Sequence, residues 1–467
     1  MANIIKSYIM PHPPIMVPEI GKGEEKKIEK TFNACNSIGE ELSRLKPHTI
    51  ILITPHGPVF RDAIALSKVD RIKGDFRKFG ASNIQMACKI NNELTEAILE
   101  EARKKHILIA DITENSMEEY GVSLELDHGG MVPLYFINKN YKDYELVHIT
   151  YGILPKIQLY EFGMLIKEAV RKYYNDVVII ASGDLSHKLS DEGPYGFNPL
   201  GSVYDKGITS LLSEGDVLNI FNMDDKLIDA AGECGMRSFY IMLGAMDGCS
   251  IDGKLLSYEG PFGVGYGVLS FEAAPAENRN FLEELIEAKE TKLRLKRETE
   301  DVYVKLARES LEHFIMEGRY INIPDYVPEE MKANRRGVFV SLKKDGELRG
   351  CIGTISPVTN NCAEEILRNA VEAGERDPRF FPVDEEELSE LVYSVDVLMP
   401  PEPASIEDLD VKKYGVIVRS GTRAGLLLPD LEGVDTTNEQ LSIALRKAGI
   451  SPSEDYEIER FEVIRHM

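Results

Sequence analysis

Apolar positions in the first 275 residues alternate between two patterns. Short, mostly apolar runs rich in β-branched side chains predict buried strands at 50–53, 107–110, 146–149 and 177–181. Between them, apolar residues recur at helical spacing and predict helices at 26–45, 91–105, 158–174 and 234–246. This alternation is typical of an α/β fold in which helices cover a central sheet, although it does not give the order of the strands.

The pattern changes after residue 275. Residues 277–300 are dense in Glu, Lys and Arg, with Leu and Ile at helical intervals, which predicts a solvated helix. Beyond it, apolar runs at 337–342 and 348–354 flank a polar turn and predict a β-hairpin. We therefore expect an N-terminal domain at 1–275, a charged linker helix at 276–297 and a smaller α+β domain at 298–467.

Composition narrows the class of protein. A chain of 467 residues is too long for one hydrophobic core, and its formal charge of -24 disfavours binding to nucleic acids or anionic membranes. Six cysteines without any Cys-x-x-Cys spacing argue against a structural zinc site and a disulfide framework. No signal peptide or apolar run of about 18 residues is present, so we expect a soluble, cytoplasmic protein.

Four of the nine histidines lie near the ends of predicted strands. His56 follows the strand at 50–53, His187 follows the strand at 177–181, and His12 and His128 adjoin apolar runs. Open α/β sheets bind their ligands at the carboxyl ends of the strands. A single histidine in such a place is more often structural, but four of them favour one shared site.

This histidine set predicts a metal centre. Two neutral imidazoles and one carboxylate form the facial triad that suits non-haem Fe(II), and His12 and His56 can supply the imidazoles. Glu233 is the best acidic candidate because it lies between glycines ahead of an apolar helix. Its alternative role is a helix N-terminal acid, favoured by the helix dipole. Cys234 is a rival ligand because thiolates bind iron and zinc. Zinc or another divalent metal is therefore an alternative to Fe(II).

His187 is a candidate for proton transfer. An imidazole with a pKa near neutrality can take a proton from a substrate hydroxyl and return it later, and Asp184 could fix its tautomer. The competing interpretation is a hydrolase triad of Asp184, Ser186 and His187. It is disfavoured because residues so close in sequence diverge along a strand or turn, whereas a triad must converge.

The motifs around His12, His56, His128, His187 and Glu233 resemble the class III extradiol dioxygenase catalytic subunit (LigB) superfamily, which includes the Memo proteins. The resemblance covers about residues 4–272. It implies Fe(II) held by His12, His56 and Glu233, with His187 as acid and base and His128 on the substrate or oxygen side. Memo-type members carry a cysteine near the third ligand, as this chain does immediately after Glu233.

The C-terminal part is similar to the AMMECR domain over about residues 298–467. The similarity is carried by Arg-Gly-Cys-Ile-Gly at 349–353, Arg-Asp-Pro-Arg-Phe at 376–380 and Gly-Leu-Leu-Leu-Pro at 425–429. Arg349 and Cys351 suit a pocket for a small anion or nucleotide-like ligand, although a tight hairpin whose glycines allow close packing is the favoured interpretation. The order of the two domains resembles the AmmeMemoRadiSam fusions, which implies an association with a radical SAM enzyme.

Two functions follow as hypotheses. The first is an Fe(II)-dependent dioxygenase of the extradiol ring-cleavage type, which uses O2 on a small, aromatic molecule. The second is a metal- and ligand-binding module without dioxygenase activity that partners a radical SAM protein. Oxygen-dependent activity on catechols separates the two, because a binding module would show none.

Overall fold

The computed structural model describes residues 3–276, 279–431 and 433–467. The chain divides into two compact units, Met1–Ala288 and Lys289–Met467. The division falls inside helix α11 (Phe281–Glu298), and residues 277 and 278 of the predicted linker lie outside the described residues. Among the described helices, none is both long and apolar enough to cross a membrane.

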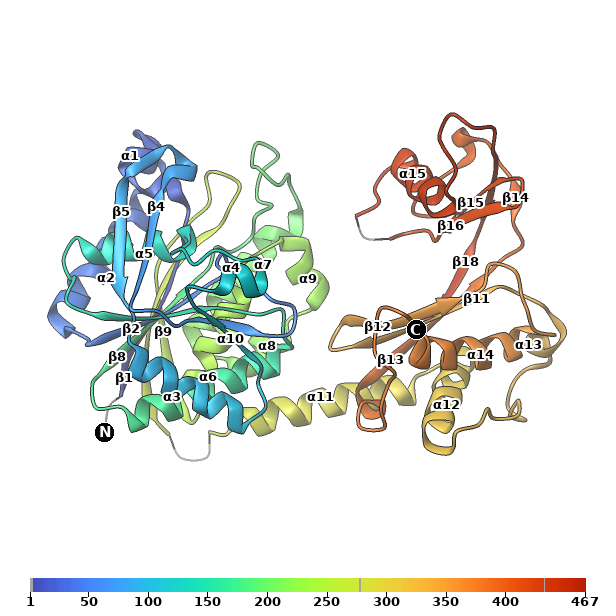
Figure 1. Ribbon diagram of the computed structural model, residues 1–467, viewed down its shortest axis with the longest axis horizontal. Coiled ribbons are helices and arrows are strands. Elements are labelled where there is room, and N and C mark those ends of the chain that lie inside the picture. Colours follow the sequence, from blue (N-terminus) through green and yellow to red (C-terminus); the bar gives the residue numbers. More distant parts are fainter. Residues whose placement is uncertain (1–2, 277–278, 432) are drawn as a thin grey trace. The chain divides into compact units, whose positions relative to one another are not determined.

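The N-terminal unit is built on an eight-stranded mixed sheet with the order β6-β3-β7-β2-β8-β1-β10-β9 (Figure 1). Its strands are β1 (Ile4–Met10), β2 (Thr49–Thr54), β3 (Ile64–Ser67), β6 (Ile109–Ile112), β7 (Glu145–Thr150), β8 (Val177–Ser182), β9 (Cys249–Glu259) and β10 (Tyr266–Pro275). The four central strands β7, β2, β8 and β1 run parallel. Their residues are buried almost throughout, as expected for strands covered on both faces.

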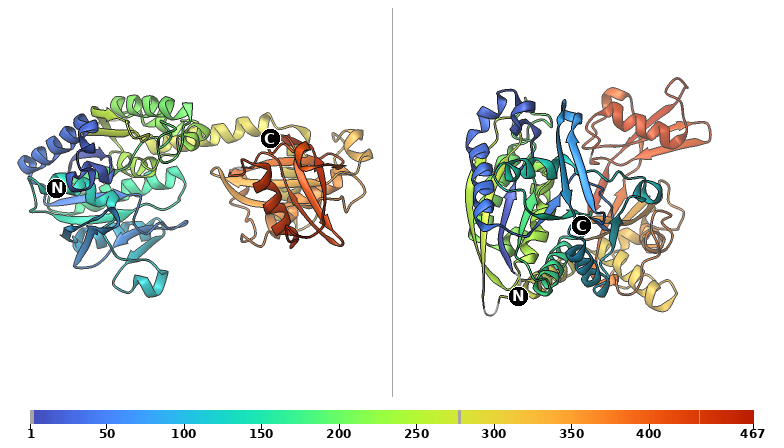
Figure 2. Two further views of the ribbon diagram at one scale, coloured as in Figure 1. Left: turned by 90° about the horizontal axis from the view of Figure 1, so that it is seen from above. Right: turned by 60° about the vertical axis from the view of Figure 1, so that its left-hand side comes forward.

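Helices cover both faces of this sheet (Figures 1 and 2). One apolar core joins the sheet to α3, α6, α7, α8 and α10, and a second core joins the opposite face to α2 and α5. The helices are α1 (Pro18–Gly21), α2 (Glu29–Leu45), α3 (Asn92–Lys104), α4 (Ser116–Tyr120), α5 (His128–Asn138), α6 (Lys156–Lys172), α7 (Pro199–Glu214), α8 (Val217–Phe221), α9 (Asp225–Ala231) and α10 (Met236–Ala245). The predicted helix-covered α/β sheet is therefore confirmed.

A two-stranded ribbon, β4 (Arg71–Phe76) and β5 (Ala81–Lys89), projects from this unit and was not predicted. Its apolar residues Ile72, Phe76 and Met86 belong to the second core. Gly74 lets the ribbon approach the chain ahead of α5 closely, because a Cβ at that position would lie 2.3 Å from the carbonyl oxygen of Leu126. The Leu126 N–H also donates to the carbonyl of Lys73 at 2.8 Å, which fixes the ribbon to the unit.

The C-terminal unit contains two four-stranded antiparallel sheets, with the orders β12-β11-β13-β18 and β14-β17-β15-β16. The strands are β11 (Val338–Lys344), β12 (Glu347–Gly353), β13 (Leu391–Leu398), β14 (Glu402–Pro403), β15 (Gly415–Ser420), β16 (Arg423–Leu427), β17 (Glu457–Phe461) and β18 (Val463–His466). Helices α12 (Val302–Glu317), α13 (Glu329–Ala333) and α14 (Cys362–Glu375) pack with the first sheet, and α15 (Thr437–Ala448) packs with the second. The smaller α+β domain is thus also confirmed.

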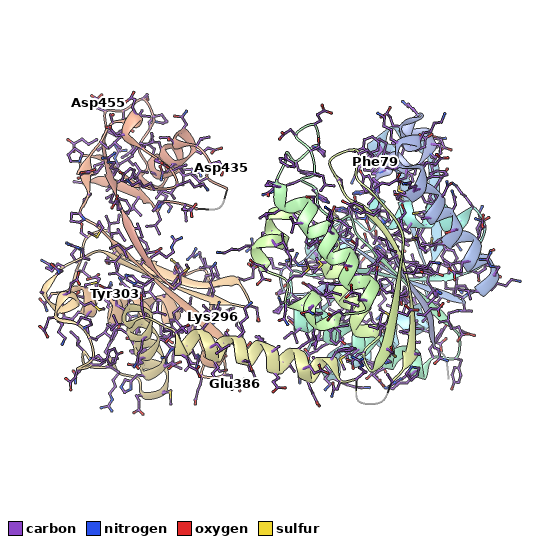
Figure 3. The ribbon with its side chains drawn as sticks, turned by 180° about the vertical axis from the view of Figure 1, so that it is seen from behind. Phe79, Lys296, Tyr303, Glu386, Asp435 and Asp455 are labelled. Atoms are coloured by element: carbon purple, nitrogen blue, oxygen red, sulfur yellow. The ribbon has the colours of Figure 1, made fainter. Side chains whose placement is uncertain are left out.

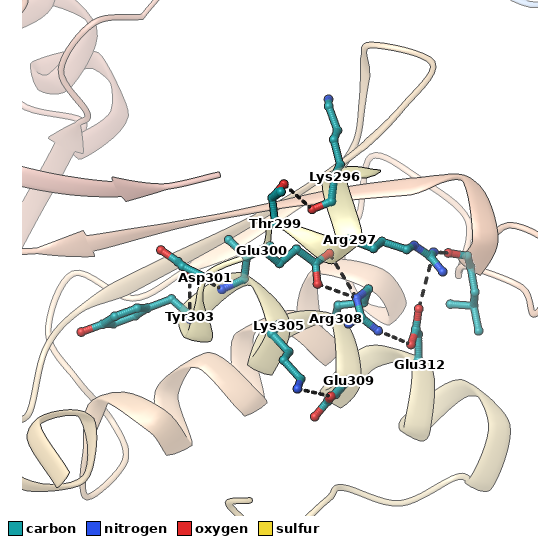
Figure 4. A network of polar contacts seen from close by, with 12 residues as sticks. Lys296, Arg297, Thr299, Glu300, Asp301, Tyr303, Lys305, Arg308, Glu309 and Glu312 are labelled. Carbon is teal, nitrogen blue, oxygen red and sulfur yellow. Dashed lines mark hydrogen bonds and ion pairs between the residues drawn. The ribbon is translucent and has the colours of Figure 1, made fainter. Parts of the chain in front are cut away.

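The predicted hairpin of this unit is the pair β11 and β12. Its turn places Asp345 and Gly346 at positive φ angles of 53° and 88°, which is why the Asp-Gly pair occurs there. Elsewhere in this unit, a polar network joins the end of α11 to α12 (Figure 4). In that network the Arg308 guanidinium donates to Glu300 and, one helical turn along, to Glu312.

Candidate metal centre

Three parallel neighbours of the first sheet carry the predicted site residues. Strand β8 lies between β1 and β2, so the carboxyl ends of all three meet at one edge of the sheet. His12, His56 and Asp184 each lie two residues beyond the last residue of their strand. Topology therefore brings together side chains that are far apart in the sequence.

His12 and His56 meet at the centre of this edge. The Nε2 atoms of the two imidazoles are 3.0 Å apart. His128, the first residue of α5, completes a group whose three ligand atoms lie within 4.8 Å of one another. Its ring stacks on that of His56, with centroids 4.3 Å apart and an angle of 15° between the planes.

The protonation of His12 can be assigned from its partner. The hydroxyl of Ser182 donates its single proton to the carbonyl of Gly129 at 2.5 Å, so towards His12 Nδ1, 2.9 Å away, it can only accept. Nδ1 therefore carries the proton, and Nε2 of a neutral His12 presents a lone pair towards His56. A bonded Nδ1 with a bare Nε2 is the arrangement found in histidines that bind metals.

Burial keeps these imidazoles neutral. His12 is only 2% exposed, and burial followed by the neighbouring His56 lowers its pKa well below the usual value. Burial, His56 and His12 also lower the pKa of His128 to about 3. His56 is the exposed member of the group, so the cluster is open to solvent on that side. Neutral imidazoles bind metals without first losing a proton.

The distances fit a single transition-metal ion. Two nitrogens bound at right angles to one metal, each at about 2.1 Å, lie about 3.0 Å apart. That is the separation of the Nε2 atoms of His12 and His56. With the same right-angled bonds, a sulfur bound at about 2.3 Å would lie about 3.1 Å from such a nitrogen.

Cys234 places a sulfur near this pair. Its Sγ atom is 3.6 Å from Nε2 of His12, and it accepts the N–H of Asp184 at 3.4 Å. Its own carbonyl accepts the hydroxyl of Tyr151 at 3.0 Å, which helps to hold the segment ahead of α10. Burial, followed by the charges of Asp184 and Glu233, raises the pKa of this thiol well above its usual value. Metal binding would therefore have to displace the thiol proton.

Glu233, predicted as the third ligand, faces elsewhere. Its Oε2 atom accepts the backbone N–H of Met236 at 2.6 Å, at the first turn of α10. Burial raises its pKa to about 7, against the opposing effect of that N–H. Among the described residues, the donors that lie within 4.8 Å of one another are the three imidazoles of His12, His56 and His128, and neither Glu233 nor Cys234 is one of them. The hydrogen bond to Met236 matches the helix-terminus role, and the metal role of Glu233 stays a prediction.

Asp184 and His187 lie beside the imidazole pair. Asp184 Oδ1 accepts the backbone N–H of His12 at 2.9 Å, and its Oδ2 is 3.9 Å from Nε2 of the same residue. Burial raises the pKa of Asp184 to about 6, which the His12 N–H opposes. Burial also lowers the pKa of His187, whose Nε2 is buried and has no hydrogen-bond partner among the described residues.

Behind the imidazoles is a buried network that the sequence analysis missed. His148, 2% exposed in β7, places Nε2 3.3 Å from Asp127 Oδ2 and Nδ1 2.8 Å from the hydroxyl of Ser67. Asp127 Oδ1 accepts the Thr54 hydroxyl at 2.6 Å. The network thus ties the end of β2, ahead of His56, to the start of α5. The available signal was a lone histidine within an apolar strand.

The two predicted residues of the C-terminal unit are engaged in local structure. Arg349 donates through Nε and Nη2 to Glu387 at 3.0 and 2.7 Å, and through Nη1 to the carbonyl of Phe381. Cys351 donates its N–H to Asp377 at 2.9 Å, and its sulfur accepts the Ser341 hydroxyl. These contacts hold the segment at 377–387 against the hairpin, and the pocket for a small anion or nucleotide-like ligand stays a prediction.

Comparisons with known proteins agree with this architecture. The family described as the catalytic LigB subunit of aromatic ring-opening dioxygenase matches residues 6–269, and the family AMMECR1 matches residues 304–466. A protein of Clostridium acetobutylicum, CA_C1420, is 53% identical over 460 residues, which cover 98% of each chain. A protein of Thermotoga maritima is 53% identical over 170 residues, covering 36% of this chain and 98% of its own. The crystal structure of uncharacterized protein PH0010 from Pyrococcus horikoshii is 34% identical, covers 36% of this chain and 91% of that chain, and has a TM-score of 0.34.

Proposed function

Because the chain belongs to the family of catalytic LigB subunits of aromatic ring-opening dioxygenases, we propose that its N-terminal unit binds one Fe(II) ion and uses O2 to open a small aromatic diol. The observation that carries this proposal is the convergence on Nε2 of His12. That lone pair faces the Nε2 of His56 at 3.0 Å and the sulfur of Cys234 at 3.6 Å. The substrate within this class is unidentified.

His12, His56 and Cys234 are the residues that would hold the metal. The separation of the His12 and His56 nitrogens matches bonds to one ion, and the sulfur of Cys234, which lies 3.6 Å from His12 but outside the 4.8 Å group of imidazoles, would have to move towards His56 to join them. The same donors would also accept zinc or another divalent metal. When bound, iron would supply Lewis acidity towards substrate oxygens and one-electron chemistry towards O2. Ser182 fixes the orientation of His12, and the Asp184 N–H satisfies the sulfur of Cys234.

The remaining imidazoles would serve the substrate. His187 is neutral because burial lowers its pKa, and its Nε2 has no protein partner among the described residues, so it can accept a proton from a substrate hydroxyl. His128, stacked on His56, would line the substrate side. Asp184 would hold the His12 backbone and influence His187, whose pKa its charge raises.

Oxygen uptake tests the proposal. Protein purified anaerobically and loaded with Fe(II) should consume O2 in the presence of a catechol and form a ring-opened product with new visible or near-ultraviolet absorbance. The His12→Ala variant should show neither. A panel of catechols that gives no O2 uptake with the fully iron-loaded protein would contradict the dioxygenase proposal.

Cys234 also favours a second candidate. Oxygenase facial triads take a carboxylate as the third ligand, whereas here a sulfur lies nearest to the imidazole pair. The unit could therefore be a metal- and ligand-binding module that acts with a radical SAM protein. Full metal retention without O2 uptake, together with co-elution with that partner on size-exclusion chromatography, would support this second candidate over the first.

A further inference from the structure

Two exposed aromatic side chains lie against the imidazoles that the proposed metal ligands leave unused. Phe79 is in the turn Arg77–Phe79 at the tip of the β4–β5 ribbon, and its ring centroid is 5.2 Å from that of His128. Tyr195 stacks on His187 with centroids 5.0 Å apart and an angle of 25° between the planes. Figure 3 labels Phe79 on the projecting ribbon. Each ring comes from a segment outside the central sheet.

The hydrophobic cores account for little of these two rings, since only Phe79 meets a core ring, that of Phe76, with centroids 6.3 Å apart. Phe79 is 38% exposed and Tyr195 is 60% exposed, and neither belongs to an apolar core of the described chain. Large aromatic rings left in water at a site rim are typical of ligand-binding surfaces, where one face awaits a partner. A stacked imidazole covers only one face of the Tyr195 ring.

Both segments are anchored, so the rings are held in place. At the ribbon tip, the Arg77 guanidinium donates to both carboxylate oxygens of Asp75 at 2.6 to 2.9 Å. The loop that carries Tyr195 is closed by a bridge between Leu189 and Phe197. Leu189 also donates its N–H to the carbonyl of Gly263 at 3.0 Å. In Figure 1 the ribbon and this loop, drawn in green, stand up on the same side of the unit.

Charge at the ribbon tip adds a preference for the charge of the ligand. Arg77 is neutralised by Asp75, but the neighbouring Lys78 is exposed and makes no hydrogen bond or ion pair within the described parts of the chain. It immediately precedes Phe79, whose ring lies 5.2 Å from that of His128. In a chain with a net charge of -24, an unpaired lysine beside the site favours an anionic ligand.

We propose that Phe79 and Tyr195 are the substrate-recognition residues of this site, and that they bind a flat conjugated ring whose anionic substituent is attracted by Lys78. The inference rests on the proposed function and adds to it a specificity surface and the charge of the ligand. Ring stacking would orient the substrate between His128 and His187, while the lysine would select among rings by charge.

Binding to full-length, zinc-loaded protein tests this inference, because zinc cannot turn the substrate over. The probes are 3,4-dihydroxybenzoate, the neutral catechol and the non-aromatic anion succinate, each titrated calorimetrically with metal-free protein in parallel. Wild type should bind 3,4-dihydroxybenzoate most tightly and succinate least. Phe79→Ala and Tyr195→Ala should each weaken both ring probes by about 3- to 10-fold. Phe79→Trp should restore ring binding.

Lys78→Gln separates charge from stacking. It should weaken 3,4-dihydroxybenzoate by about 2- to 5-fold at low salt and leave catechol unchanged. Tyr174→Ala, which removes a tyrosine that is 89% exposed before β8, and Lys142→Gln are matched controls at the opposite ends of the strands and should change nothing. All variants should keep the wild-type metal content.

Three outcomes would overturn the inference. They are wild-type affinity for ring probes in Phe79→Ala and Tyr195→Ala, succinate binding as tight as that of the rings, and no ring binding by wild type in either metal state. Failure of the proposed function looks different. Wild type would then fail to bind metal or to take up O2, whereas Phe79→Ala would still weaken ring binding by the metal-free protein.

Discussion

The Nε2 atom of His12 lies 3.0 Å from that of His56, and the opposite nitrogen of His12 is held by Ser182 at 2.9 Å. This pairing fixes both the tautomer and the direction of the His12 lone pair. Ser182→Ala should therefore weaken Fe(II) or zinc binding by about 10- to 100-fold, the usual effect of losing such a partner. Competition with a chelator measures the affinity. Ser43→Ala on α2 is the control, and an unchanged affinity in Ser182→Ala would contradict this role.

The third metal ligand is tested by a pair of adjacent variants. Cys234→Ala should lose most of the bound metal, because its sulfur lies 3.6 Å from Nε2 of His12. Glu233→Gln should keep the metal, since its carboxylate accepts the Met236 N–H at the start of α10. Glu233→Ala should instead lower the free energy of unfolding by about 1 kcal/mol through loss of that cap. Metal analysis of the two variants decides between the ligands. Metal loss in Glu233→Gln with metal retention in Cys234→Ala would identify Glu233 as the ligand.

His187 should act on protons rather than on the metal. Its buried Nε2 lacks a hydrogen-bond partner among the described residues, so nothing but a ligand engages it. His187→Gln should leave the metal content intact and lower the rate of O2 uptake by about 10²- to 10⁴-fold. His313→Gln, in α12 of the other unit, is the control. Metal loss in His187→Gln, or a wild-type rate with full metal, would each refute the role.

Asp205 gives a prediction for pH. The carboxylate accepts the N–H of Ser186, next to His187, at 2.8 Å and the Tyr258 hydroxyl at 2.6 Å, and burial raises its pKa from 3.8 to about 6. The folded state therefore holds this proton more tightly than the unfolded state. Stability from this group is present below pH 3.8 and is lost as the pH rises through 6, by up to about 3 kcal/mol.

Asp205→Asn should remove that dependence. Urea unfolding of wild type and variant at pH 4.5 and pH 7 gives the comparison, because other titrating groups contribute equally to both proteins. Relative to the variant, wild type should be less stable at pH 7 than at pH 4.5. Parallel changes in the two proteins would show that Asp205 ionises normally in the folded state.

Local patterns predicted the scaffold well. The apolar run at 50–53 lies within β2, and the helices predicted at 26–45 and 158–174 end within two residues of α2 and α6. The order of the strands depends on contacts between distant segments, and periodicity carries no information about those. The β4–β5 ribbon escaped prediction because its alternation is interrupted by Gly74 and by charged residues.

The residue types of the site were predictable from the sequence, but the directions in which their side chains point were not. His12 and His56 were identifiable because each follows a strand end. The sequence could not decide between Glu233 and Cys234, since adjacent residues ahead of a helix point to different sides and only the packed structure shows which one faces the imidazoles. His148 was missed because a buried histidine in an apolar strand has the same pattern as a core residue.

The most direct test of the account is the metal content of wild type and His12→Ala after anaerobic loading with Fe(II) and gel filtration, with circular dichroism to confirm that both are folded. His12 is the residue at which the His56 nitrogen and the Cys234 sulfur converge. We predict about one iron per chain in wild type and almost none in the variant. Equal iron in both proteins would contradict it.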